Sequence, residues 1–292
     1  MSLLSKISLF SDNKSSLDDS LCKLLNRFKG EYELSKKETP ETNIWEIRAE
    51  FSALETWLID IFSQENDSLP PFDYILWPNN HQQPPKLLVF DMDSTFIQIE
   101  VIDELAKRHG VGESVSQVTE AAMRGELDFS ESLISRVACL KGLVDSTIDD
   151  LSHKLPLSEG VAQLVGICKK QDIKIAIVSG GFTPFVSHLQ QTMELYRVKA
   201  NDLEIVNGEL TGRVLGSIVD ANAKAVFVNE LKDELSLNRN DIMTIGDGAN
   251  DLVMMAETGF NLAYRAKPAV QAQAKGRMNN TNLNQLADIF DW

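Results

Sequence analysis

The chain has 292 residues, 43% of them hydrophobic and 24% charged, which is typical of a globular protein with one large domain or two smaller ones. The formal net charge is −15 and no lysine- and arginine-rich run is present, which argues against binding to nucleic acid or to an anionic membrane surface. An anionic small substrate stays compatible with this charge if a metal ion or local positive charge binds it.

Cysteine usage and the absence of long apolar runs bear on the compartment. Cys22, Cys139 and Cys168 are widely spaced and form no C-x-x-C pair, which argues against a disulfide framework or a zinc site. The first ten residues are too polar for a signal peptide, and no apolar run approaches the ~20 residues of a membrane span. We therefore expect a cytoplasmic protein.

Residues 1–77 alternate between strand and helix patterns in the order βαββαβ. Strands are predicted at 6–10, 31–34, 43–51 and 72–77, and helices are predicted to begin at Ser16 and Ser52. The pattern resembles a small ferredoxin-like or ACT-type module, which implies amino-acid binding or dimerisation; a structural appendage without a ligand is equally compatible. Residues 78–85 have the composition of a linker, and we expect His81 within it to be solvated.

The apolar stretch 87–90 predicts a buried strand that runs directly into Asp91 and Asp93. Because α/β proteins bind ligands at strand ends, we interpret the two aspartates as a catalytic pair; an ordinary surface turn is the alternative. If extended geometry persists through Asp93, the two side chains face the same way and both carboxylates reach one phosphate.

Residues 97 to about 156 are predicted to be helical, without a clear strand signal. On the helix predicted from Asp128, Phe129 and Arg136 lie seven residues apart and share one face at the edge of an apolar stripe. Arg136 either extends into water along its own aliphatic stem or faces a cleft, where it would hold an anion.

Strands and helices alternate again after this segment. The apolar runs 173–178, 242–245 and 260–264 predict strands, Asn207-Gly208 predicts a hairpin turn, and Pro184 favours the start of a helix. Two of these strands end at the polar loops 179–181 and 246–251. Because the carboxyl ends of parallel strands share one edge of a sheet, we predict that both loops meet Asp91 there.

Each of these loops has a simpler interpretation when taken alone. Gly180-Gly181 could be a plain turn, and Lys224 could be a solvated helix lysine. The loop from Asp247 could bind calcium, although Ala249 stands where an EF-hand needs an oxygen ligand and Thr258 takes the place of its closing glutamate.

Together, Asp91-x-Asp93-x-Thr95, Ser179, Lys224 and Gly246-Asp247-Gly248-x-Asn250-Asp251 resemble the four motifs of the haloacid dehalogenase superfamily. The stretches 90–95, 123–129, 179–182 and 245–251, with Glu100, strongly resemble the phosphoserine phosphatase family within it, over residues 86 to 275. The resemblance implies an α/β Rossmann-like core with a parallel sheet in residues 86–292, a helical cap insertion at about 97–156, and the small α+β module in front of them.

The resemblance also implies a reaction, namely the hydrolysis of O-phospho-L-serine in the last step of L-serine biosynthesis. Asp91 would be the nucleophile that forms an aspartyl-phosphate, and Asp93 would protonate the leaving oxygen and later activate water. Four carboxylates against one lysine would repel a phosphate dianion, so a divalent cation is needed, and oxygen ligands favour Mg²⁺. The implied metal ligands are Asp91, the backbone carbonyl of Asp93, and Asp247.

The remaining roles follow from the same resemblance. The implied substrate-binding residues are Ser179, Gly180, Lys224 and Asn250 for the phosphate side and Glu100 and Arg136 for the amino acid. Asp251 would orient the site, and Met123 and Phe129 would close the pocket. The alternatives are a phosphotransferase that passes the phosphoryl group to another alcohol such as homoserine, and a non-catalytic protein that senses an amino acid. The expected partners are the small substrate and a second copy of the chain bound through residues 1–77.

Overall fold

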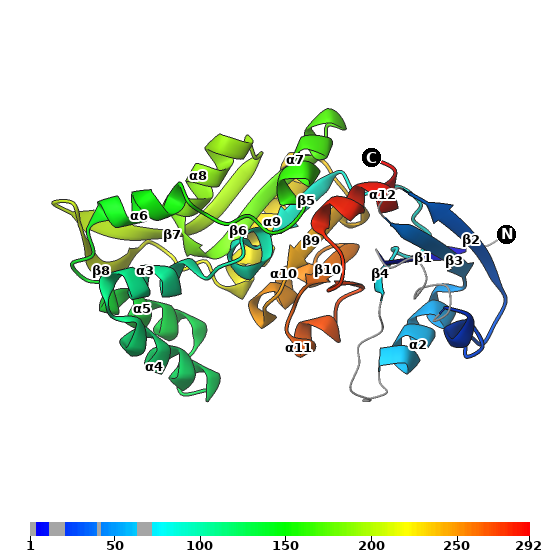
Figure 1. The fold of residues 1–292 in the computed structure, drawn as a ribbon, viewed down its shortest axis with the longest axis horizontal. Coiled ribbons are helices and arrows are strands. Elements are labelled where there is room, and N and C mark those ends of the chain that lie inside the picture. Colours follow the sequence, from blue (N-terminus) through cyan, green and yellow to red (C-terminus); the bar gives the residue numbers. More distant parts are fainter. Residues whose placement is uncertain (1–3, 12–20, 40–41, 63–71) are drawn as a thin grey trace. The chain divides into compact units, whose positions relative to one another are not determined.

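The computed structural model describes residues 4–11, 21–39, 42–62 and 72–292. The chain forms two compact units, one of residues 1–88, 159–174 and 232–292 and the other of residues 89–158 and 175–231. Each unit therefore combines segments that lie far apart in the sequence (Figure 1). The boundaries predicted from composition, 1–77, 78–85 and 86–292, stay a prediction.

The first unit begins with a four-stranded antiparallel arrangement in the order β2-β3-β1-β4. Its elements are β1 (Ser5–Ser11), β2 (Tyr32–Glu38), β3 (Asn43–Ala49), α2 (Phe51–Phe62) and β4 (Asp73–Leu76). Leu54, Trp57 and Ile61 of α2 pack with Ile7 and Leu9 of β1 in one buried cluster. The predicted strands and the helix near Ser52 are confirmed, whereas the predicted helix start at Ser16 lies outside the described residues.

The strand β4 also joins this segment to the C-terminal part of the same unit. There β9 (Ile242–Gly246), β10 (Phe260–Tyr264) and β11 (Gly276–Met278) pair in parallel, and β11 pairs antiparallel with β4. The helices α7 (Val161–Lys170), α10 (Leu252–Ala256), α11 (Pro268–Gln271) and α12 (Leu286–Phe290) complete the unit. The expectation of a solvated His81 is wrong, because its half-buried ring lies 6.0 Å from the Phe260 ring, centroid to centroid.

The second unit contains the predicted helical segment and a second set of strands. The segment folds as α3 (Val101–His109), α4 (Gly112–Met123), α5 (Phe129–Cys139) and α6 (Asp145–Ser152), and Asp128 begins α5 with a reciprocal capping box to Glu131. After it come β6 (Lys174–Phe182), α8 (Thr183–Met193), β7 (Arg197–Val206), β8 (Glu209–Leu215) and α9 (Ala221–Glu234). β6 and β7 are parallel, and β7 and β8 form the predicted hairpin at Asn207-Gly208.

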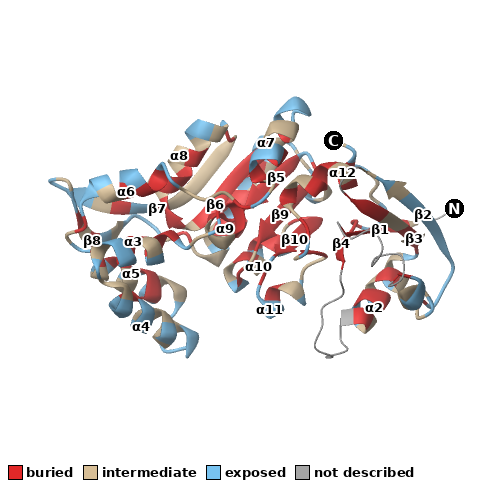
Figure 2. Ribbon diagram, viewed as in Figure 1, coloured by how far each residue is buried: buried red, intermediate tan, exposed pale blue. Residues whose placement is uncertain are grey.

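The strands that end at the polar loops are deeply buried. All four residues of β5 (Leu87–Phe90) are 0% exposed, and every residue of β9 and β10 is buried (Figure 2). Strands covered on both faces are typical of α/β proteins, and the fold class predicted from the sequence is confirmed. Among the described residues, no helix is long and apolar enough to cross a membrane.

Candidate active site

The chain turns sharply where β5 ends. Asp91 is extended, and residues 92–96 then form one wide turn that the backbone N–H of Ile97 closes by donating to the carbonyl of Met92 at 3.0 Å. The strand geometry that the spacing argument assumed through Asp93 therefore ends with β5 at Phe90, although the backbone of Asp93 itself is extended, with φ of −65° and ψ of 137°. The turn requires a left-handed backbone at Ser94, with φ of +55°.

Asp91 is buried and engaged by positive charge. Its Oδ1 accepts a hydrogen bond from its neighbour's backbone, Met92 N, at 2.8 Å, and lies 2.8 Å from Nζ of Lys224. The Lys224 side chain is 0% exposed, so a solvated helix lysine is excluded. A buried ammonium next to a buried carboxylate is energetically acceptable only because each compensates the charge of the other.

Asp93 lies in a different electrostatic environment. Its Oδ1 accepts from the backbone N–H of Val101 at 3.0 Å, and its Oδ2 lies 3.5 Å from Oγ of Ser179. Burial, and then the negative charges of Glu100 and Asp91, raise the pKa of Asp93 well above its ordinary value. Asp93 is therefore suited to carry a proton that it can donate.

The sequence predicted that the strand would end at residue 178, but β6 continues to Phe182, and residues 179–181 form an irregular stretch within it that we call the β6 loop. This stretch meets the turn of residues 92–96, as the sequence predicted. The backbone N–H of Gly181 donates to Oγ of Ser179 at 2.8 Å, which fixes the hydroxyl. A side chain on Gly181 would reach within 2.6 Å of the Asp93 carboxylate, and one on Gly180 within 2.8 Å of the Phe129 ring. Both glycines are needed because other groups approach the backbone closely, which a plain turn would not require.

The helical insertion carries Arg136, a second positively charged side chain besides Lys224. Arg136 is half-buried on α5, and burial lowers its pKa while the carboxylates of Asp103, Glu100 and Asp93 act in the opposite direction. Its Nε donates to the backbone carbonyl of Ser132, one turn earlier on α5, at 3.4 Å. Glu100 is exposed and accepts from Oγ of Ser94 at 2.7 Å.

Two residues predicted to close the pocket differ in their surroundings. Phe129 lies against the backbone of Gly180, as described above. Met123, at the end of α4, is 81% exposed, and its role as a pocket-closing residue stays a prediction.

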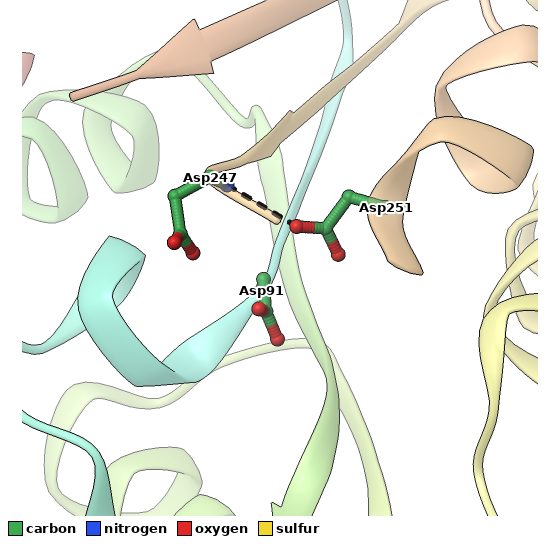
Figure 3. Close-up of side chains that lie close together, drawn as sticks. All are labelled: Asp91, Asp247 and Asp251. Atoms are coloured by element: carbon green, nitrogen blue, oxygen red, sulfur yellow. Dashed lines mark hydrogen bonds between the residues drawn. The ribbon is translucent and has the colours of Figure 1, made fainter. Parts of the chain in front are cut away.

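In the first unit, the loop after β9 is organised by Asp251. The Asp251 side chain is fully buried, and its Oδ2 accepts from the backbone N–H group of Asp247 at 3.1 Å (Figure 3). The same oxygen accepts from the backbone N–H group of Gly248 at 3.0 Å. A methyl group at Gly246 would overlap the Asp251 carboxylate. Asp251 therefore holds the backbone that carries Asp247, and Asn250 lies half-buried beside Gly248.

One group of acidic residues in the described part of the chain could hold a metal ion. Asp247 and Asp251, both on the loop after β9 in the first unit, each offer a carboxylate oxygen to it, and these two atoms lie within 4.8 Å of each other (Figure 3). An all-oxygen donor set suits a hard divalent cation.

Sequence reasoning missed two residues that support this geometry. Ser94 holds Glu100 through its hydroxyl, and the non-glycine left-handed backbone there gives no local sequence signal. Asn201, in β7, hydrogen-bonds the backbone of Gly180 and Gly181. Asparagine is depleted in strands, so a buried strand Asn such as this one was a usable but weak signal.

Comparison with known proteins agrees with this geometry. The family model of haloacid dehalogenase-like hydrolases matches residues 85–259. The chain is similar to phosphoserine phosphatase from Archaeoglobus fulgidus, with 41% identity over 75% of this chain and 64% of the relative. It is also similar to phosphoserine phosphatase from Idiomarina loihiensis, with 44% identity over 68% of this chain and 91% of that protein.

A solved structure extends the likeness to nearly the whole chain. The unliganded crystal structure of a probable phosphoserine phosphatase from Vibrio cholerae matches with a TM-score of 0.77 and 36% identity. The match covers 98% of this chain and 86% of that one. The chain spans 64% of the length of the relative from Archaeoglobus fulgidus and 63% of the relative from Vibrio cholerae serotype O1.

Proposed function

We propose, because this chain belongs to the haloacid dehalogenase-like hydrolase family, that it hydrolyses O-phospho-L-serine to L-serine and phosphate. The observation that carries the proposal is the contrast between two neighbouring carboxyl groups. Asp91 is ion-paired with buried Lys224 at 2.8 Å, whereas the pKa of Asp93 is raised by burial and by adjacent negative charge. A charged nucleophile beside a protonated acid is what cleavage of a phosphate ester requires.

The proposed reaction has two steps. A carboxylate oxygen of Asp91 attacks phosphorus and the bond from phosphorus to the serine oxygen breaks, while Asp93 gives its proton to that oxygen. The product is serine and an aspartyl-phosphate. Asp93, now ionised, takes a proton from water as the water attacks phosphorus and the bond from phosphorus to the Asp91 oxygen breaks, which releases phosphate and restores both carboxyl groups.

Phosphate binding is proposed for Ser179, the backbone of Gly180, and Lys224. The fixed Ser179 hydroxyl, at 2.8 Å from the Gly181 N–H, supports this role. We propose Mg²⁺ as the metal, with Asp91, the carbonyl of Asp93, and Asp247 as ligands. When bound, the ion would offset the repulsion between the carboxylates and a phosphate dianion.

Recognition of the amino acid is proposed for Arg136 and Glu100. A guanidinium binds a carboxylate with two parallel hydrogen bonds, and Glu100 offers a negative charge to the ammonium group. Arg136 is half-buried and lies near three carboxylates, which supports this role. Its guanidinium is only partly hydrated, so it loses little water when it binds the carboxylate of a ligand. Asn250 is proposed to contribute to substrate binding, and Phe129 to exclude water.

Cellular role and assembly are proposals of the same kind. Free cysteines at positions 22, 139 and 168 suit a reducing compartment, so we propose a cytoplasmic location and a place in serine synthesis. A homodimer through residues 1–77 is proposed as well, and light scattering of the purified protein tests it.

The experiment that tests the function is a set of initial rates on phosphomonoesters. We expect phosphate release from O-phospho-L-serine with Mg²⁺, loss of activity in EDTA, and far lower rates with phosphothreonine and phosphoethanolamine. Added homoserine should yield no phosphate ester by ³¹P NMR. A protein that prefers another ester, or that transfers the phosphoryl group to homoserine, would refute the proposal.

A further inference from the structure

Asn201 lies at the centre of a set of contacts that no proposed catalytic role explains. It is 1% exposed, and its carboxamide makes contacts at both ends. Nδ2 donates to the carbonyls of Gly180 at 2.9 Å and Gly181 at 3.2 Å, and Oδ1 accepts from the backbone N–H of Val219 at 2.8 Å. One side chain thus joins the β6 loop to the segment that precedes α9.

The pairing of β6 with β7 explains why this side chain is needed. Val178 pairs with Lys199 and Phe182 with Asn201, so β6 takes four residue steps (178 to 182) where β7 takes two (199 to 201). The extra backbone leaves the regular ladder at Ser179, Gly180 and Gly181. Carbonyls that leave a ladder in a buried or half-buried place need other donors, and the carboxamide of Asn201 supplies them for half-buried Gly180 and buried Gly181.

The other end of the carboxamide acts on the helix that carries Lys224. Val219 is followed by Asp220, whose side chain accepts from the backbone N–H of Ala223 at 2.8 Å and whose carbonyl accepts from that of Lys224 at 3.0 Å. The Val219 contact therefore fixes the start of α9, one turn before Lys224. The β6 loop and Lys224 are positioned by the same side chain.

We propose that Asn201 is a positioning residue that sets the spacing between the β6 loop and Lys224, and so the affinity of the site for a phosphate group. The inference rests on the proposed phosphate-binding role of Ser179, Gly180 and Lys224. The inference predicts an effect on phosphate binding only, because Asn201 forms no hydrogen bond with α3 or α5, where the amino-acid part of the substrate is proposed to bind. Loss of Asn201 should weaken the binding of phosphate and leave the binding of L-serine unchanged.

The variant that tests this is Asn201→Asp. It keeps an oxygen for the Val219 N–H and puts a second oxygen against the carbonyls of Gly180 and Gly181, where donors are required. Calorimetry with Mg²⁺ should show the dissociation constant for inorganic phosphate raised about tenfold or more, and that for L-serine changed less than twofold. The matched control is Asn229→Asp, at a carboxamide that donates to Ala225 within its own helix at 3.2 Å, and both constants should stay at wild-type values.

Several outcomes would overturn the inference. Phosphate binding by Asn201→Asp at wild-type affinity would do so, and so would equal losses for phosphate and L-serine, which indicate general loosening. If Asn201→Asp does not fold, hydrogen exchange on the wild-type protein decides: inorganic phosphate should slow exchange at Val219 together with Gly180. Protection confined to Gly180 would contradict the coupling. Failure of the proposed function is seen separately, as wild-type protein that does not hydrolyse phosphoserine.

Discussion

Asp73 provides a quantitative test of how residues 1–77 are held to the rest of the first unit. It lies at the start of β4, is 0% exposed, and accepts from the backbone N–H groups of Asn279, Asn280 and Thr281. The side chains of Asn280 and Thr281 donate as well, and all these distances lie between 2.7 and 3.2 Å. A single carboxylate therefore satisfies the donors of a whole loop.

Replacing Asp73 by alanine leaves these donors in a buried space that only water can fill. An unsatisfied buried donor costs about 1 to 3 kcal/mol, and entering water recovers part of the total, so we expect a loss of about 3 to 5 kcal/mol in unfolding free energy. The melting temperature should fall by roughly 10 °C. Asp73→Asn keeps one acceptor oxygen and should lose less.

Urea unfolding followed by circular dichroism measures the change. The control is Asp60→Ala in the same segment, which removes an ion pair to Arg27 whose side chains are 34% and 48% exposed, and it should cost no more than about 1 kcal/mol. Activity per folded molecule should not change in either variant. A loss below 1 kcal/mol for Asp73→Ala would refute the account of Asp73 as the anchor of this segment.

Three further variants test the site. Because the raised pKa of Asp93 makes its ionised form oppose folding, the folded protein loses stability as pH rises through that pKa. Asp93→Asn should therefore raise the melting temperature of the metal-free protein more at pH 8 than at pH 4, and equal gains at both pH values would contradict this. The same variant should lower kcat ~10²-fold or more. Arg136→Lys should raise KM for phosphoserine roughly tenfold but not that for phosphoethanolamine, which lacks the carboxylate; parallel changes would argue against the assignment. Gly246→Ala should displace Asp251 and raise the Mg²⁺ concentration needed for half-maximal activity about tenfold. The control is Gly166→Ala, whose added methyl group meets no neighbouring side chain or distant backbone within 4 Å, and it should leave that concentration unchanged.

The features that could be predicted from the sequence are those with a local signal. The runs 87–90 and 242–245 are continuous and apolar, so their burial and the polar loops behind them followed from pattern alone. The capping box at Asp128 and the turn at Asn207-Gly208 are equally local. Because parallel strands share one edge, the meeting of Asp93 with Ser179 could be inferred as well.

The features that could not be predicted depend on partners far away in the chain or on fine backbone geometry. Asp73 finds its donors 206 to 208 residues later, and nothing near it in sequence marks it as buried. The turn after Asp91 depends on one left-handed serine, a conformation that sequence patterns do not predict. His81 lies in a linker-like stretch, yet its ring packs against Phe260 in a distant strand.

The central claim is that Asp91 becomes phosphorylated during turnover, and trapping of the intermediate tests it most directly. Wild-type protein mixed with O-phospho-L-serine and Mg²⁺ would be quenched in acid, reduced with borohydride, digested, and examined by mass spectrometry. An acyl-phosphate is reduced to an alcohol, so we predict that Asp91 alone is converted to homoserine, and that Asp91→Asn gives neither this product nor free phosphate. Turnover without modification of Asp91, or phosphate release by Asp91→Asn, would contradict the account.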